Sequence, residues 1–75
     1  MNEEEVFMSV VKVIEIIGVS EKGWDDAIRD GVRKAAKNID NITGVKVLGI
    51  TAKVQNGELT SYKANLSIVF GLTDR

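Results

Sequence analysis

The only segment with a helical period runs from Ser20 to Asn41 and reads SEKGWDDAIRDGVRKAAKNIDN. Its apolar and small residues recur at intervals of three and four, which places them on one stripe of an α-helix. These residues are Trp24, Ala27, Ile28, Gly31, Val32, Ala35 and Ile39. The opposite side carries acids early and bases late, as the helix dipole and spaced ion pairs favour. Ser20 is predicted as the N-cap, and the helix is predicted to stop at Asn38, Asp40 and Asn41.

Every other patterned segment of the chain is typical of a β-strand. Residues 10–17 are β-branched almost throughout and end at Gly18, and because both faces are apolar, both are expected to be covered. Residues 42–54 and 59–72 are predicted as two further strands, since Asn56-Gly57 between them is a strong signal for a tight hairpin turn. The expected fold class is therefore α+β with a β-α-β-β order of elements. The order of strands in the sheet is left open.

A hairpin centred on this turn fixes which residues face each other across its two strands. The expected pairs are Val54 with Leu59, Thr51 with Tyr62, Gly49 with Ala64, Val47 with Leu66, and Val45 with Ile68. One face is then apolar and is predicted to meet the helix. It carries Val45, Val47, Tyr62, Leu66, Ile68 and Phe70. The other face is mixed and contains Gly44, Lys46, Ile50 and Lys63.

The length of the chain predicts one domain that is not complete as a monomer. Of its 75 residues, 1–8 are interpreted as a flexible lead-in and 9–75 as the folded domain. At this size only about 60% of the unfolded surface can be buried by the chain alone. Strands of about 12 residues extend about 40 Å, which is more than one helix covers. Apolar strands left at a sheet edge favour aggregation, so the sequence predicts an oligomer.

Composition excludes several classes of function. The chain has neither cysteine nor histidine, which removes disulfides, thiolate metal sites and the commonest general base. It also lacks a glycine-rich phosphate loop and a convergent group of Ser, Lys and carboxylates, so no catalytic residue and no enzyme activity are predicted. A net charge of -1 gives no basis for nucleic-acid binding. No apolar run is long enough for a membrane span, and the acidic start is unlike a signal peptide, so a soluble, cytoplasmic protein is expected.

The tryptophan and two glycines of the strands have two interpretations each, and a glycine of the helix has one. Trp24 is either a packing residue of the helix stripe or a ligand platform, and packing is favoured. Gly44 and Gly49 either open space for a ligand or mark bulges and close contacts within a strand. Gly31 in the middle of the helix costs roughly 1 kcal/mol relative to alanine, which close packing explains.

The charged side chains also have two interpretations. Lysines on the mixed sheet face either gather an anion such as phosphate or are simply solvated; they are Lys46, Lys53 and Lys63. Acidic residues on the helix either bind a hard cation such as calcium or pair with the bases near them. They are Asp25, Asp26 and Asp30, and ion pairing is favoured because no loop has calcium-binding spacing.

Two runs of the sequence together resemble the start of the dodecin family. They are residues 11–20, VKVIEIIGVS, and residues 23–28, GWDDAI. Asp40-Asn41, Ser61-Tyr62 and Phe70-Gly71-Leu72 fall where the pattern of that family places them. The resemblance implies a β-α-β-β protomer whose three-stranded antiparallel sheet wraps around the helix, assembled as a hollow homododecamer. Dodecins are known as flavin-binding storage or buffering proteins without catalytic turnover.

The resemblance also implies the place of a ligand site whose chemistry has changed. The tryptophan on which the flavin ring stacks corresponds to Gly44, the glutamine that binds the ring corresponds to Lys63, and Lys46 shares their face. The first change removes a stacked pair worth about 0.5 to 1.5 kcal/mol beyond area burial, and the second replaces an amide by a donor-only cation. Two hypotheses result. The shell either binds a small flat or anionic ligand, with riboflavin or flavin mononucleotide as the family ligand, or is an ion-binding or structural assembly without flavin.

Overall fold

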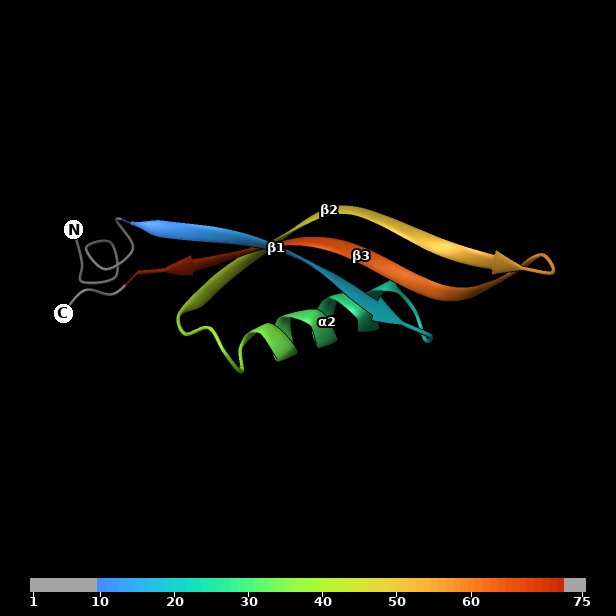
Figure 1. Cartoon of the computed structure of the whole chain (residues 1–75), viewed down its shortest axis with the longest axis horizontal. Helices are drawn as coiled ribbons and strands as arrows, with labels where there is room; N and C mark the ends of the chain where they lie inside the picture. Colours follow the sequence, from blue (N-terminus) through green and yellow to red (C-terminus); the bar gives the residue numbers. More distant parts are fainter. Residues whose placement is uncertain (1–9, 73–75) are drawn as a thin grey trace.

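The computed structural model describes residues 10–72, which form one helix and a three-stranded sheet (Figure 1). In chain order the elements are β1 (Val11–Ser20), α2 (Trp24–Ala35), β2 (Ile42–Gln55) and β3 (Glu58–Gly71). β3 lies between the other two strands and is antiparallel to both. The predicted β-α-β-β fold with an antiparallel sheet is confirmed. The lead-in predicted over residues 1–8 lies outside the described residues.

The hydrophobic core lies between α2 and the central strand. The fully buried hydrophobic residues are Ala27 of α2 and Ala64, Leu66 and Ile68 of β3. α2 packs mainly on β1 and β3 and only slightly on β2. Val45 and Val47 of β2 pair with core residues of β3, as predicted, yet they remain 40% and 43% exposed. The helix therefore covers only part of the apolar face that the sequence assigns to it.

The prediction that Ser20 caps the helix is wrong. β1 continues through Ser20, and the 12-residue helix begins at Trp24 with Gly23 at its N-cap. The Ser20 hydroxyl instead accepts hydrogen bonds from the backbone N–H groups of Lys22 (2.8 Å) and Gly23 (3.4 Å), and donates one to Asp26 (2.7 Å). This serine thus organises the turn from strand to helix. Between residues 10 and 72 no helix has the length and apolar character that a membrane crossing requires.

Two glycines bring β1 and α2 into close contact. A Cβ added to Gly18 would collide with the backbone carbonyl of Ala27. A Cβ added to Gly31 would lie 3.1 Å from Leu66 Cδ1 and 3.6 Å from the Gly18 Cα. Close packing therefore explains the glycine in the middle of the helix, as predicted.

The β2–β3 hairpin has the predicted turn. Asn56 and Gly57 adopt left-handed φ angles of 53° and 80°, as a tight hairpin turn of this kind requires. Three predicted pairs are confirmed, and they lie toward the two ends of the hairpin. They are Val54 with Leu59, Val47 with Leu66, and Val45 with Ile68.

Between these pairs the observed register differs from the predicted one by one residue. Tyr62 pairs with Ala52 instead of Thr51, and Ala64 pairs with Ile50 instead of Gly49. Two bulges cause the difference, because Thr60 is an extra residue on β3 and Leu48 is an extra residue on β2. The second bulge cancels the first, so the register returns to the predicted one. Ile50 consequently lies on the helix side of the sheet rather than on the opposite side.

Candidate functional site

The predicted ligand positions lie on the face of the sheet that points away from α2, which we call the outer face. Its members follow from the pairing and from the alternation of side chains along each strand. β1 contributes Val11, Val13, Glu15, Ile17 and Val19; β3 contributes Ser61, Lys63, Asn65, Ser67 and Val69; β2 contributes Gly44, Lys46, Gly49, Thr51 and Lys53. The outer face therefore has an apolar lane along β1 and a polar lane with three lysines along β3 and β2.

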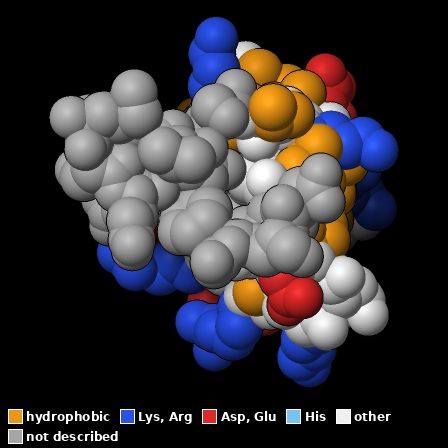
Figure 2. Space-filling view, turned by 90° about the vertical axis from the view of Figure 1, so that its left-hand side faces the viewer, with side chains coloured by type: hydrophobic (Ala, Val, Ile, Leu, Met, Phe, Trp, Pro, Cys, Tyr) orange, Lys and Arg blue, Asp and Glu red, His pale blue; other side chains and the backbone are white. Residues whose placement is uncertain are grey.

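The apolar lane is uncovered in the protomer. Val13 is 55% exposed and Ile17 is 60% exposed, whereas Ile14 and Ile16 on the other side of β1 pack against the core. The predicted cover is thus present on the inner face of β1, whereas the described residues of the protomer leave its outer face exposed. Seen along the long axis from the end where β1 begins and β3 ends, hydrophobic side chains reach the surface beside Lys and Arg side chains (Figure 2).

Gly44 and Lys46 are neighbours on the outer face. Gly44 pairs with Val69, and a Cβ added to Gly44 would meet the Val69 Cβ at 3.9 Å, an ordinary contact. The described residues therefore leave space above Gly44. Lys46 pairs with Ser67, which also pairs with Glu15 of β1, so a cation and an anion flank a hydroxyl across the sheet. Register shifts immediately precede both Gly44 and Gly49, which confirms that these glycines mark bulges.

Lys63 lies far from the other two positions in the same protomer. It pairs with Val19 on one side and with Thr51 on the other. It lies six positions before Val69, the partner of Gly44, on β3, which corresponds to about 20 Å along a strand. The structure therefore brings Gly44 and Lys46 together and places Lys63 on the same face at a distance.

Trp24 packs where α2 meets the hairpin. Its indole Nε1 donates a hydrogen bond of 2.8 Å to the backbone carbonyl of Thr51. Its ring meets the Tyr62 ring edge to face, with centroids 5.0 Å apart and planes at 81°. The packing interpretation of Trp24 is confirmed, and the hydrogen bond fixes the start of the helix to β2.

Most acidic residues of α2 pair with basic residues on the same helix. The ion pairs are Asp25–Arg29 at 3.0 Å, Asp30–Arg33 at 3.5 Å and Asp30–Lys34 at 3.1 Å. The ion-pair interpretation of Asp25 and Asp30 is confirmed, whereas Asp26 accepts the hydrogen bond from Ser20. Within residues 10–72 no group of three or more His, Cys, Asp or Glu side chains is placed to hold a metal ion.

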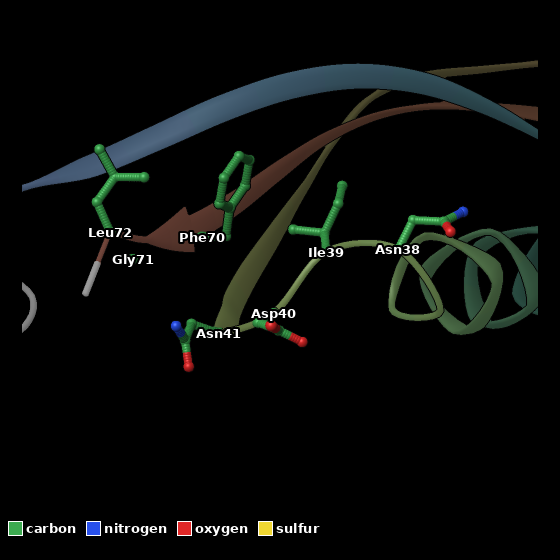
Figure 3. A pocket seen from close by; sticks show the side chains of 7 residues that line it. All are labelled: Asn38, Ile39, Asp40, Asn41, Phe70, Gly71 and Leu72. Carbon is green, nitrogen blue, oxygen red and sulfur yellow. The ribbon is translucent and has the colours of Figure 1, made fainter. Parts of the chain in front are cut away.

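One hollow that the sequence does not predict lies where the chain passes from α2 to β2. It has a volume of about 340 Å³ and is lined by Asn38, Ile39, Asp40, Asn41, Phe70, Gly71 and Leu72 (Figure 3). Asn41 has a left-handed φ of 65°, and its carbonyl accepts a 2.9 Å hydrogen bond from the Gly71 N–H. The side chains of Asp40 and Asn41 point away from those of Phe70 and Leu72 (Figure 3). The polar groups therefore do not converge on the apolar wall.

A second hollow forms a groove between α2 and β2, with a volume of about 460 Å³. It is lined by Asp25, Ile28, Arg29, Val32, Arg33 and Val45. The sequence assigns Ile28, Val32 and Val45 to surfaces that cover each other. They remain partly open because the close contact of Gly18 with Gly31 holds the helix over β1. That pair of glycines is the signal in the sequence from which the groove could have been predicted.

Comparison with known proteins defines the family. The model of the dodecin family matches residues 10–73, which include every element described above. The chain belongs to the dodecin family. This dodecin is 33% identical over 63 residues to the calcium dodecin of Mycobacterium tuberculosis, and the match covers 84% of this chain and 89% of that protein.

Solved dodecin structures share the fold of this dodecin. The dodecin from Streptomyces davaonensis superimposes with a TM-score of 0.82 at 25% identity, covering 87% of this chain and 96% of that one. The crystal structure of the calcium dodecin from Mycobacterium tuberculosis superimposes with a TM-score of 0.73 at 31% identity, covering 84% and 90%. That protein is described as a calcium-chelating antigen with a novel calcium-binding site. The family predicted from residues 11–20 and 23–28 is therefore confirmed.

Proposed function

We propose that this dodecin assembles as a homododecamer that binds or stores a small ligand without catalysing a reaction. The apolar lane of β1 supports assembly most directly, because Val11, Val13, Ile17 and Val19 are between 48% and 60% exposed in the protomer. Removing apolar surface from water yields about 25 cal/mol per Å², and a second copy is the available cover for a long, uncovered strand. Light scattering at micromolar concentration tests the assembly. The expected mass is that of twelve protomers of 8.2 kDa each. The mass of a single protomer would refute the proposed assembly.

The proposed ligand is small and either flat or anionic, with the family's flavin as the first candidate. The open space above Gly44 beside Lys46 supports this proposal. Because Gly44 and Lys63 are about 20 Å apart in one protomer, a single flavin ring that contacts both positions has to lie between subunits. Without the stacking aromatic, the lysines are the main attraction for the phosphate of flavin mononucleotide.

Equilibrium dialysis of the oligomer against riboflavin and flavin mononucleotide, at several salt concentrations, tests the ligand. Micromolar binding of either compound supports a flavin-binding function. Binding of the mononucleotide alone, weakened by salt, assigns the affinity to the lysines, because exposed charges are screened by ions. Binding of neither compound would reject flavin and leave the second candidate.

The second candidate is an ion-binding assembly. The 33% identity with a protein named calcium dodecin favours it. Calcium takes six to eight oxygen ligands, and residues 10–72 of one protomer do not gather three carboxylates in one place. A calcium site that takes three or more carboxylates from these residues therefore has to draw them from more than one subunit. Isothermal titration of the metal-stripped oligomer with Ca²⁺, with Mg²⁺ as the control ion, tests this candidate, and equal or absent heats for the two ions would argue against it.

A further inference from the structure

The hollow where the chain passes from α2 to β2, which we call the end hollow, has an apolar wall. The wall consists of Ile39, Phe70 and Leu72, whose side chains point to the same side in Figure 3. Leu72 is 44% exposed, and Val10 beside it is 54% exposed. The two residues are neighbours because the Leu72 N–H donates a 3.1 Å hydrogen bond to the Val10 carbonyl. Residues 10–72 therefore leave this apolar end of the protomer uncovered.

The end hollow suits an apolar side chain better than a polar ligand. Its volume of about 340 Å³ exceeds the roughly 150 Å³ in which a buried benzene ring fits. The side chains of Asp40 and Asn41 point away from the apolar wall (Figure 3). Removal of this wall from water is the main gain that an occupant can provide, and an aromatic ring brings the largest apolar surface of any side chain.

The stretch that precedes β1 carries such side chains. Residues 6–8 are Val-Phe-Met, and the match to the family model begins only at residue 10. Phe7 is three residues before Val10, about 10 Å of extended chain. Val10 is hydrogen-bonded to Leu72 of the apolar wall. A tether this short gives Phe7 a high effective concentration at the end hollow of its own chain.

The charges near the end hollow favour the same occupant. Lys12 pairs with Phe70 across the sheet and so shares its face, and Lys37 directly precedes Asn38 of the lining. Among residues 10–72 neither lysine makes an ion pair. Residues 3–5, next to Val-Phe-Met, are all glutamate. Exposed ion pairs contribute little to stability, so these charges would orient the segment while the apolar contact holds it.

We infer that residues 6–8 fold back at Ser9 and dock in the end hollow of their own chain, with the Phe7 ring against the apolar wall. The docked segment covers the end of the sheet that residues 10–72 leave exposed. Residues 6–8 then belong to the folded domain, in place of the flexible lead-in predicted from the sequence. The inference does not depend on the number of copies in the assembly.

Disulfide cross-linking tests the docking, because the chain has no cysteine of its own. Val6→Cys with Asn38→Cys keeps Phe7 and puts one thiol on the segment and the other on the lining of the hollow. The two form a disulfide only where their Cα atoms come within about 7 Å. After oxidation by dissolved oxygen, a denaturing gel without reductant and mass spectrometry identify the products. The expected product is a disulfide within one chain, formed about tenfold faster than when Phe7→Ala is added, because the segment without its ring meets the hollow only through its tether.

The matched control is Val6→Cys with Gly49→Cys, since Gly49 lies on the outer face of the sheet. It is expected to cross-link no faster than the pair that carries Phe7→Ala, and far-UV circular dichroism checks that every variant is folded. Absence of a disulfide within one chain, or a rate that Phe7→Ala leaves unchanged, overturns the inference. A disulfide between two chains also overturns it, and gives the hollow to the segment of a neighbouring copy. Light scattering of the wild type tests the proposed assembly separately, so failure of one does not imply failure of the other.

Discussion

Gly18 of β1 and Gly31 of α2 face each other so closely that a Cβ on Gly31 would lie 3.6 Å from the Gly18 Cα. This contact sets the lateral position of the helix on the sheet. It draws α2 over β1 and β3 and leaves the inner side of β2 partly open. Two small residues thus determine both the packing of the core and the existence of the groove.

Replacing Gly18 by alanine is expected to destabilise the protein by about 2 to 3 kcal/mol, since the added methyl group collides with the Ala27 carbonyl and the backbone has to shift. Urea denaturation followed by circular dichroism measures the change. Gly49→Ala is the control, because a Cβ there meets nothing within 4 Å among the described residues. Equal stability of the two variants would contradict the close contact.

Replacing Trp24 by phenylalanine is expected to cost about 1 kcal/mol. The change removes the hydrogen bond to the Thr51 carbonyl but keeps an aromatic ring against Tyr62. The midpoint of thermal unfolding measures it, with Tyr62→Phe as the comparison that retains the hydrogen bond. A loss no greater for Trp24→Phe than for Tyr62→Phe would show that the indole hydrogen bond does not fasten the helix to β2.

Replacing Gly57 by alanine is expected to cost about 1 to 2 kcal/mol, since a residue with a Cβ is strained at a φ of 80°. The neighbouring change Asn56→Gly is expected to be tolerated, because glycine adopts the left-handed φ of 53° at this position without strain. Thermal unfolding of the two variants compares them. A tolerated Gly57→Ala would mean that the turn rearranges.

The double change Gly44→Trp with Lys63→Gln is expected to create or strengthen flavin binding. It supplies a flat ring where space is open and an amide at the second ring contact that the family resemblance implies. Titration with riboflavin, which has no phosphate, isolates the ring contacts from attraction to the lysines. Gly49→Trp with Lys63→Gln is the control, because Gly49 shares the outer face but not the family position. No gain over this control would mean that the geometry of the pocket differs from that of flavin-binding dodecins.

The elements of this fold could be predicted from local patterns. The three-and-four spacing around Ala27 and Ile28 indicates the helix, the β-branched run of β1 indicates a strand, and Asn56-Gly57 indicates the hairpin. The helix start was predicted too early because Ser20 has the side chain of a capping residue, yet its backbone belongs to β1. The local sequence does not show whether a residue such as Ser20 belongs to the end of a strand or to the start of the following helix.

The candidate site was predicted in part. Gly44, Lys46 and Lys63 do share a face, because the strand alternation that places Lys63 is undisturbed and the two bulges cancel before Gly44. The position of Ile50 was wrong, since it lies between the bulges at Leu48 and Thr60. Bulges of this kind depend on how neighbouring strands pack. Neither leucine at position 48 nor threonine at position 60 is a residue type that indicates a bulge. The groove depends on the contact of Gly18 with Gly31. The two glycines can be found in the sequence, but their contact follows only once β1 and α2 pack together.

The contact between Trp24 and the hairpin also has a spectroscopic consequence. Trp24 is the only tryptophan of the chain, so its emission comes from one known place, beside Tyr62 and the Thr51 carbonyl. Separation of the helix from the hairpin on unfolding would expose the indole to water and shift its fluorescence emission to longer wavelength. An ordinary fluorimeter can therefore follow the folding of each subunit, while scattered light from the same sample follows association, so the order of the two events can be measured.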